Sequence, residues 1–156
     1  MTNKEMEQVL SDQESIRQVL NNYAYGCDTR TWKLFDEVFT PTVEFNYGGE
    51  YSAQGRDKLV KLIRNSLGGC GPTQHLLGNF SINVTGDTAS CFCYIRAFHV
   101  GLGAKKGQLY EVWGAYKDKL ILTTETSSYP QWKICERKML ITYELGSRDV
   151  LGPAAI

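Results

Sequence analysis

Hydrophobic residues in the first part of the chain recur at the spacing of an amphipathic helix. Residues 11–14, Ser-Asp-Gln-Glu, have the composition of a capping box, and apolar residues follow them at intervals of three and four. These residues are Ile16, Val19, Leu20, Tyr23, Ala24 and Cys27. The pattern predicts a helix over residues 12–27. It also predicts a short helix that Pro41 stops, because proline has no backbone N–H, and a third helix over residues 56–67.

The rest of the chain alternates apolar and polar residues, which is the period of a strand. Strands are predicted over residues 43–47, 75–84, 89–100, 109–122 and 132–143. Thr85-Gly86-Asp87 has the composition of a tight hairpin turn between two of them. Helices followed by long antiparallel strands predict the α+β class, with three N-terminal helices covering one face of a curved mixed or antiparallel sheet.

These elements make one domain over residues 1–156, with flexible tails expected at residues 1–8 and 146–156. The C-terminal tail is expected to be disordered or to lie across the mouth of a pocket. A curved sheet backed by helices encloses a concave site of the kind that binds small apolar ligands.

Composition narrows the function classes. The 17 basic and 17 acidic side chains give no net charge, which argues against a nucleic-acid-binding protein. No apolar run approaches the ~20 residues that span a bilayer, and residues 1–8 lack the apolar core of a signal peptide, so a cytoplasmic location is expected. The five cysteines do not form a disulfide framework, and neither zinc-ligand spacing nor a phosphate-binding loop is present. We therefore expect no metal and no cofactor.

Two histidines and one aspartate are the candidates for acid–base chemistry. His99 shares a strand face with small and apolar residues, where burial would lower the pKa of its imidazole. His75 opens a predicted strand, and Asp28 follows the buried face of the first helix. A carboxylate at that position could orient a histidine that acts as a general base. The alternative is that each histidine is a hydrogen-bonded structural residue and that Asp28 only ends a helix.

Several short segments stand out by their order and spacing. Residues 25–32 contain a helix-end aspartate followed by a tryptophan, residues 73–78 contain Gln-His-x-x-Gly, residues 95–99 end in Arg-x-x-His, and Tyr47 lies on a predicted strand. Together these segments resemble the scytalone dehydratase and SnoaL-like family of the NTF2-like superfamily. The resemblance covers about residues 8–143 and implies a cone-shaped α+β barrel.

The resemblance also implies roles for individual residues. His75 would be the general base, oriented by Asp28, and Tyr47 would donate a hydrogen bond to a carbonyl that gains charge. His99 would be a second acid or base, or would hold the substrate or a water. A dehydrochlorinase of the same superfamily lacks this second histidine, so His99 favours the dehydratase branch. The resemblance further implies a homo-oligomer, a trimer or dimer, and Phe92, Tyr94, Phe98 and Trp113 are candidate contact residues.

Departures from the family pattern affect the substrate contacts. Cys27 stands where the dehydratase has a tyrosine, and residues 110–112 supply Tyr110 and Val112 where it offers a serine and an asparagine. Scytalone itself is therefore a doubtful substrate. The residues expected to contact the substrate are Tyr23, Cys27, Tyr110, Val112 and Arg96.

The sequence thus predicts a cofactor-independent lyase of secondary metabolism that eliminates water from a small cyclic carbonyl or polyketide-type substrate. An isomerase or cyclase of a polyketide, steroid or terpenoid is the first alternative. A non-catalytic small-molecule-binding module of the same fold is the second.

Overall fold

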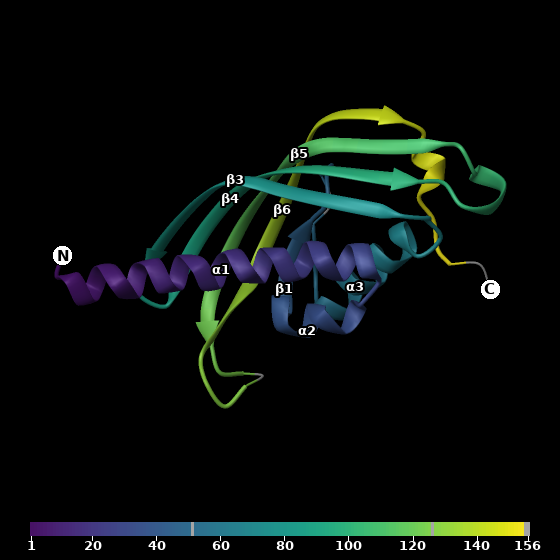
Figure 1. The fold of residues 1–156 in the computed structure, drawn as a ribbon. Coiled ribbons are helices and arrows are strands. Elements are labelled where there is room, and N and C mark those ends of the chain that lie inside the picture. Colours follow the sequence, from purple (N-terminus) through teal and green to yellow (C-terminus); the bar gives the residue numbers. More distant parts are fainter. Residues whose placement is uncertain (51, 126, 155–156) are drawn as a thin grey trace.

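A curved sheet with helices on its concave side forms the framework of the computed structural model, which describes residues 1–50, 52–125 and 127–154 (Figure 1). The helices are α1 (Asn3–Thr29), α2 (Phe35–Val38) and α3 (Arg56–Leu67). Short 3₁₀ turns are η1 (Trp32–Leu34), η2 (Gly103–Lys105) and η3 (Arg148–Val150). The strands are β1 (Phe39–Asn46), β2 (Ala53–Gln54), β3 (Thr73–Thr85), β4 (Thr88–Val100), β5 (Leu109–Thr123) and β6 (Gln131–Gly146).

In the part of the chain that the structure describes, six strands lie in the order β2-β1-β6-β5-β4-β3. All neighbours are antiparallel except β1 and β6, which run parallel. The predicted α+β class and curved mixed sheet are confirmed. The predicted barrel is not closed: within the described residues β2 and β3 remain the two edges of the sheet. Figure 1 shows α1 lying lengthwise under the arch of the long strands.

Helix α1 begins nine residues earlier than predicted. The side chain of Thr2 accepts a hydrogen bond from the Glu5 backbone, and the Glu5 carboxylate accepts one from the Thr2 backbone. The same capping signature occurs twice in the sequence, at residues 2–5 and 11–14, and no glycine or proline separates the two. The helix therefore continues through Ser11, and the predicted start at Asp12 is wrong. No helix in the described part of the chain is both long and apolar enough to span a membrane.

The second helix ends before Pro41 and not because of it. Phe39 already has extended backbone angles and begins β1, so Pro41 lies inside a strand. The residue before a proline favours the extended region, which suits Thr40. The pairing of β1 with β6 shifts register between Phe39 and Glu44, and proline is tolerated at such an irregularity. The predicted stop at Pro41 is therefore wrong.

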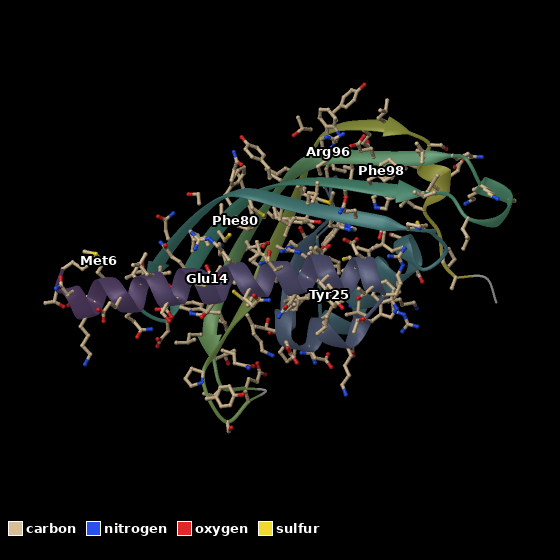
Figure 2. The ribbon with its side chains drawn as sticks, in the orientation of Figure 1. Met6, Glu14, Tyr25, Phe80, Arg96 and Phe98 are labelled. Carbon is tan, nitrogen blue, oxygen red and sulfur yellow. The ribbon has the colours of Figure 1, made fainter. Side chains whose placement is uncertain are left out.

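Strand β4 separates its side chains between the two faces of the sheet as predicted. Its buried residues are Ala89, Cys91, Cys93, Ile95, Ala97 and His99. The intervening residues point away from the core, and Figure 2 shows Arg96 and Phe98 on the side of the sheet away from α1. The inner face of β4 therefore brings His99 toward the helices.

The C-terminal segment is held against the end of α3. Gly152 donates its backbone N–H to the Ser66 carbonyl and accepts a hydrogen bond from Gly69, both at 2.8 Å. Val150 is 1% exposed. Of the tails expected to be flexible, residues 3–8 thus belong to α1 and residues 148–152 cover one end of the fold. Residues 155–156 lie outside the described residues.

Gly114 provides a test of the sheet geometry, because the β5–β6 pairing shifts register there. A Cβ atom at Gly114 would lie 2.0 Å from the Leu140 carbonyl oxygen. We expect Gly114→Ala to lower the free energy of unfolding by about 3 kcal/mol, since a backbone atom must move to make room. Gly78→Ala on β3 is the matched control, with nothing within 4 Å of its Cβ, and should change stability by less than about 0.5 kcal/mol. Urea denaturation of both variants checks this, and equal effects would contradict it.

Candidate active site

A cavity of about 220 Å³ lies between the inner face of the sheet, α1, α3 and the C-terminal segment. Histidine and tyrosine side chains supply most of its polar groups: Tyr23, Tyr47, His75, His99, Tyr110 and Tyr116. Its apolar lining consists of Leu62, Ile63, Leu67, Ile95, Ala97, Val112, Met139, Ile141 and Leu151. Aromatic rings and aliphatic side chains therefore surround a small number of hydrogen-bonding groups, as in small-molecule sites generally.

The structure brings Asp28 and His75 together at this cavity. Asp28 lies in the last turn of α1, and His75 is the third residue of β3. The Asp28 Oδ1 atom is 2.7 Å from His75 Nδ1, and Oδ2 accepts the His75 backbone N–H at 2.9 Å. The Thr73 hydroxyl donates to Oδ1 at 3.0 Å. One carboxylate is therefore bound by both the side chain and the backbone of the same histidine.

These contacts determine the protonation state of Asp28. Partial burial would raise the pKa of the carboxyl, but hydrogen bonds from the His75 side chain and backbone, and from Thr73, lower it below the ordinary value. An ionised carboxylate can only accept hydrogen bonds, so His75 Nδ1 carries the proton that bonds to it. In the neutral form of the ring, Nε2 then has the lone pair, and His75 lines the cavity. This is the arrangement of an oriented general base.

His99 lies beside His75, and their ring centroids are 5.6 Å apart. It is 3% exposed, and its Nδ1 is 3.1 Å from the Tyr110 carbonyl oxygen, to which a neutral ring donates. Burial, together with the positive charge that His75 can carry, lowers the pKa of His99 to about 4. The predicted lowering by burial is confirmed. His99 is thus a neutral imidazole near pH 7, with Nε2 available as an acceptor.

Three tyrosine hydroxyls form a chain at the inner end of the cavity. Tyr47 donates to Tyr23 at 3.0 Å, and the Tyr23 and Tyr116 hydroxyls are 3.3 Å apart. Each hydroxyl has one proton, and the chain uses two of the three in its own hydrogen bonds. One proton, on Tyr23 or Tyr116, is left for a ligand. The sequence singled out Tyr47 as the donor, but in the structure its proton is bound to Tyr23, so the donor belongs to the chain of hydroxyls.

A buried ion pair supports these tyrosines. Arg137 is 0% exposed, and its guanidinium lies 4.2 Å from the ring centroid of Tyr23 and 4.1 Å from that of Tyr116. It donates two hydrogen bonds to the carboxylate of Asp118, at 2.8 and 2.6 Å. Burial favours the neutral form, but the Asp118 carboxylate raises the pKa of Arg137 well above its usual value. The guanidinium stays charged beneath the rings.

Sequence reasoning missed Arg137, Asp118 and Tyr116. A signal for Asp118 existed, because Tyr116, Asp118 and Leu120 alternate onto the inner face of β5, where a charged residue is costly unless it is paired. The partner could not be identified from the sequence, because the pairing of Asp118 with Arg137 depends on the register of β5 against β6. That register contains two irregularities.

Of the expected substrate contacts, Tyr23, Tyr110 and Val112 line the cavity. The Tyr110 hydroxyl donates to Glu144 at 2.5 Å, and Arg148 of η3 also binds that carboxylate. Burial and the Glu144 carboxylate raise the pKa of Tyr110 to about 12. An ion pair from the C-terminal segment therefore holds one wall of the cavity.

Cys27 and Arg96 do not line this cavity. Cys27 is fully buried behind it, and burial raises the pKa of its thiol to about 12. Arg96 lies on the outer face of β4, where it pairs with Glu111 and stacks on Trp113. The alternation of β4 explains this, because Arg96 and His99 are an odd number of residues apart and so point to opposite faces. Their predicted contact with a substrate in the cavity is not supported.

No group of three or more histidine, cysteine, aspartate or glutamate side chains in the described ranges is arranged to bind a metal ion. Among the described residues, the titratable groups at the cavity are one carboxylate–histidine pair, a second histidine, four tyrosines and Arg148. These groups can move protons and donate hydrogen bonds.

The SnoaL-like domain family matches residues 8–138, which is most of the chain. The chain belongs to the SnoaL-like family. A curated relative, the uncharacterized protein Rv2910c of Mycobacterium tuberculosis, is 38% identical to this SnoaL-like protein over 82 residues. That match covers 52% of this chain and 56% of the relative, so the chain spans about half the length of the curated relatives it matches.

Solved structures confirm the predicted NTF2-like fold of this SnoaL-like protein. The Kfla4162 protein of Kribbella flavida has a TM-score of 0.80 at 18% identity, covering 91% of this chain and 97% of its own. A putative scytalone dehydratase of Novosphingobium aromaticivorans has a TM-score of 0.76 at 21% identity, covering 96% of both chains. The hexachlorocyclohexane dehydrochlorinase LinA-type3 of Novosphingobium barchaimii has a TM-score of 0.74 at 13% identity, covering 92% of this chain and 94% of its own. At these identities the likeness concerns the fold.

The low pKa of His99 predicts a specific loss of stability in acid. The folded state keeps His99 neutral down to about pH 4, whereas the unfolded chain protonates it below about pH 6.5. The unfolded state therefore binds more protons in this window, and stability falls as the pH falls. We expect wild type to lose about 2 to 3 kcal/mol more than His99→Gln between pH 7.5 and pH 4. Urea unfolding at a series of pH values measures this, and parallel curves for the two proteins would contradict it.

Proposed function

We propose that this protein is a cofactor-independent lyase that eliminates water from a small cyclic carbonyl compound. The observation that carries the proposal is the 2.7 Å contact between Asp28 Oδ1 and His75 Nδ1 at the wall of the cavity. Two proteins of the same fold are named for eliminations, a putative scytalone dehydratase and a hexachlorocyclohexane dehydrochlorinase. Both names agree with a site that removes a proton from carbon.

In the proposed reaction, His75 Nε2 takes a proton from the carbon next to the carbonyl group. The electron pair of that C–H bond forms the new double bond, and the C–O bond to the hydroxyl group on the next carbon breaks. The departing hydroxide takes up the proton from His75 and leaves as water. Asp28 stabilises the imidazolium that exists between the two steps. The free proton of the tyrosine chain binds the carbonyl oxygen as it gains negative charge.

His99 is assigned a holding role. Its pKa of about 4 makes the imidazolium form rare at neutral pH, so it cannot be the acid that protonates the leaving group. Its Nε2 can accept a hydrogen bond from the substrate hydroxyl and so orient the C–O bond that breaks. His75, after its first proton transfer, then supplies the proton.

The cavity limits the size and polarity of the substrate. A volume of about 220 Å³ lies below the usual range for sites of drug-sized ligands, which favours one or two fused rings. Apolar side chains of α3 would contact one face of such a ring system, and the tyrosines and histidines would contact its oxygens. A small polyketide-type compound of secondary metabolism fits this description.

An isomerase or cyclase is the second candidate. One base with a free Nε2 is enough to move a proton from one carbon to another, and the low pKa of His99 leaves no second acid to assist a leaving group. Product mass separates the two reactions, because dehydration loses a water and isomerisation does not. A purely ligand-binding module is less well supported, because Asp28 and His75 are within hydrogen-bond distance and the cavity between the side chains is open.

Substitution of the pair tests the proposal on a panel of cyclic β-hydroxyketones. We expect His75→Ala and Asp28→Asn each to lower kcat/KM at least about 100-fold, since the first removes the base and the second its orienting charge. Mass spectrometry identifies the product by the loss of water. Asp57→Asn, an exposed carboxylate on α3, is the control and should keep wild-type rates. Wild-type turnover in either variant of the pair would overturn the assignment.

We also propose that the protein works as a homo-oligomer, a trimer or dimer, in the cytoplasm. Large apolar side chains on the outer face of the sheet are exposed, among them Leu76, Tyr94, Phe98, Trp113 and Tyr143. Trp113 packs against Tyr143 on the neighbouring strand. Light scattering after size-exclusion chromatography should show a multiple of 17.6 kDa for wild type and a monomer for Trp113→Glu. Lys4→Glu on the exposed start of α1 should not change the mass, and a monomeric wild type would refute the proposal.

A further inference from the structure

Arg30 has an unusual backbone conformation directly after the last residue of α1. Its φ and ψ of 60° and 25° lie in the left-handed region, where a side chain is disfavoured and where helices commonly end in glycine. Asn79 is the other non-glycine residue with a positive φ in the described ranges. A long charged side chain at a position suited to glycine indicates that the side chain itself has a role.

The Arg30 guanidinium joins the end of α1 to the start of β3. Its Nη1 donates to the Cys27 carbonyl at 2.5 Å and to the Thr73 hydroxyl at 2.8 Å. Its Nη2 donates to the Gly71 carbonyl at 2.9 Å. The contact with Cys27 satisfies a carbonyl at the helix end, as a cap would. The contact with Thr73 has no capping function, because Thr73 belongs to another element.

The contact with Thr73 determines where the hydroxyl proton points. A guanidinium has only donors, so the Thr73 oxygen must be the acceptor in its bond to Arg30. The hydroxyl has a single proton, and the Asp28 Oδ1 atom lies 3.0 Å away on its other side. Arg30 thereby orients the Thr73 proton toward Asp28. Each polar group that contacts the Asp28 carboxylate is then a donor, which keeps Asp28 in its accepting, ionised form.

We propose that Arg30 is a positioning residue for the Asp28–His75 pair and that it acts through the Thr73 hydroxyl. The contribution of Arg30 to catalysis rests on the proposed function, whereas its effect on the Asp28–His75 pair does not. Without Arg30 the hydroxyl is free to rotate and Oδ1 loses a fixed donor, so the carboxylate is held less firmly against His75 Nδ1, by the His75 backbone alone. The fraction of His75 that carries its proton on Nδ1 then falls.

Nitrogen-15 NMR of the His75 imidazole in the full-length protein tests this without a substrate. At pH 7.5 we expect wild type to show His75 mainly in the Nδ1–H form. Arg30→Gly and Thr73→Val should lower that fraction, whereas Thr73→Ser, which retains the hydroxyl, should restore it. Asn79→Gly relieves a similar backbone strain away from the site and is the matched control, with an unchanged spectrum.

The choice of glycine separates positioning from capping. Glycine is favoured in the left-handed conformation, so Arg30→Gly should fold and retain its melting temperature to within a few degrees. If Arg30 were only a helix cap, that variant would keep the wild-type His75 spectrum, and this result would overturn the proposal. If Arg30→Gly does not fold, Arg30→Asn takes its place, because asparagine also tolerates the left-handed conformation and lacks the guanidinium. A wild-type His75 spectrum in that variant would overturn the proposal.

A double variant tests whether the two residues act in series. On a confirmed substrate, Arg30→Gly and Thr73→Val should each lower kcat roughly tenfold, with little change in KM. The kcat of the double variant should be no lower than that of the less active single variant, because both substitutions remove the same interaction. A kcat that is roughly 100-fold lower in the double variant would show that the two residues act independently. That result would refute the proposal that Arg30 acts through Thr73. If no panel compound is turned over, the proposed function fails, and the NMR result still decides the role of Arg30.

Discussion

The Asp28 carboxylate accepts hydrogen bonds from Thr73 and from both the backbone and the side chain of His75, all in the first residues of β3. It therefore joins the C-terminus of α1 to the sheet at the point where the candidate general base emerges. The same contacts keep the carboxyl ionised, because each one favours the charged form. A displacement of α1 along the sheet would break the hydrogen bonds between Asp28 and β3, and His75 would lose its orientation at the same time. The position of α1 and the geometry of the candidate site therefore depend on the same contacts.

The tyrosines of the cavity depend on a different interaction, the buried pair of Arg137 and Asp118. Removing one partner of such a pair costs about 3 to 5 kcal/mol, because the other is left as an unpaired buried charge. The guanidinium of Arg137 in this pair lies against the ring faces of Tyr23 and Tyr116. The cavity thus has a proton-accepting side at His75 and a proton-donating side at the tyrosines. A substrate whose carbonyl oxygen gains negative charge as its carbon loses a proton needs both sides at once.

Local pattern was enough to predict the parts of the fold that depend on neighbouring residues. The helix over residues 56–67, the faces of β4 and the position of the hairpin turn near Gly86 were all predicted from spacing. The start of α1 was predicted wrongly, because two equivalent capping signals occur in the sequence. The choice between them depends on whether the residues that separate them continue the helix. Arg137 and Arg30 could not be predicted, since their roles depend on strand register and on a left-handed turn that bring distant residues together.

The environment of each histidine explains why the two differ in their suitability as a base. No carboxylate among the described residues forms a hydrogen bond with His99: a backbone carbonyl binds its Nδ1, and burial disfavours its charged form. His75 has the Asp28 carboxylate 2.7 Å from its Nδ1, which fixes the orientation of a ring that lines the cavity. A charged His75 in turn disfavours protonation of His99, because the rings are 5.6 Å apart. His99 therefore adds a neutral hydrogen-bonding group to the cavity near pH 7.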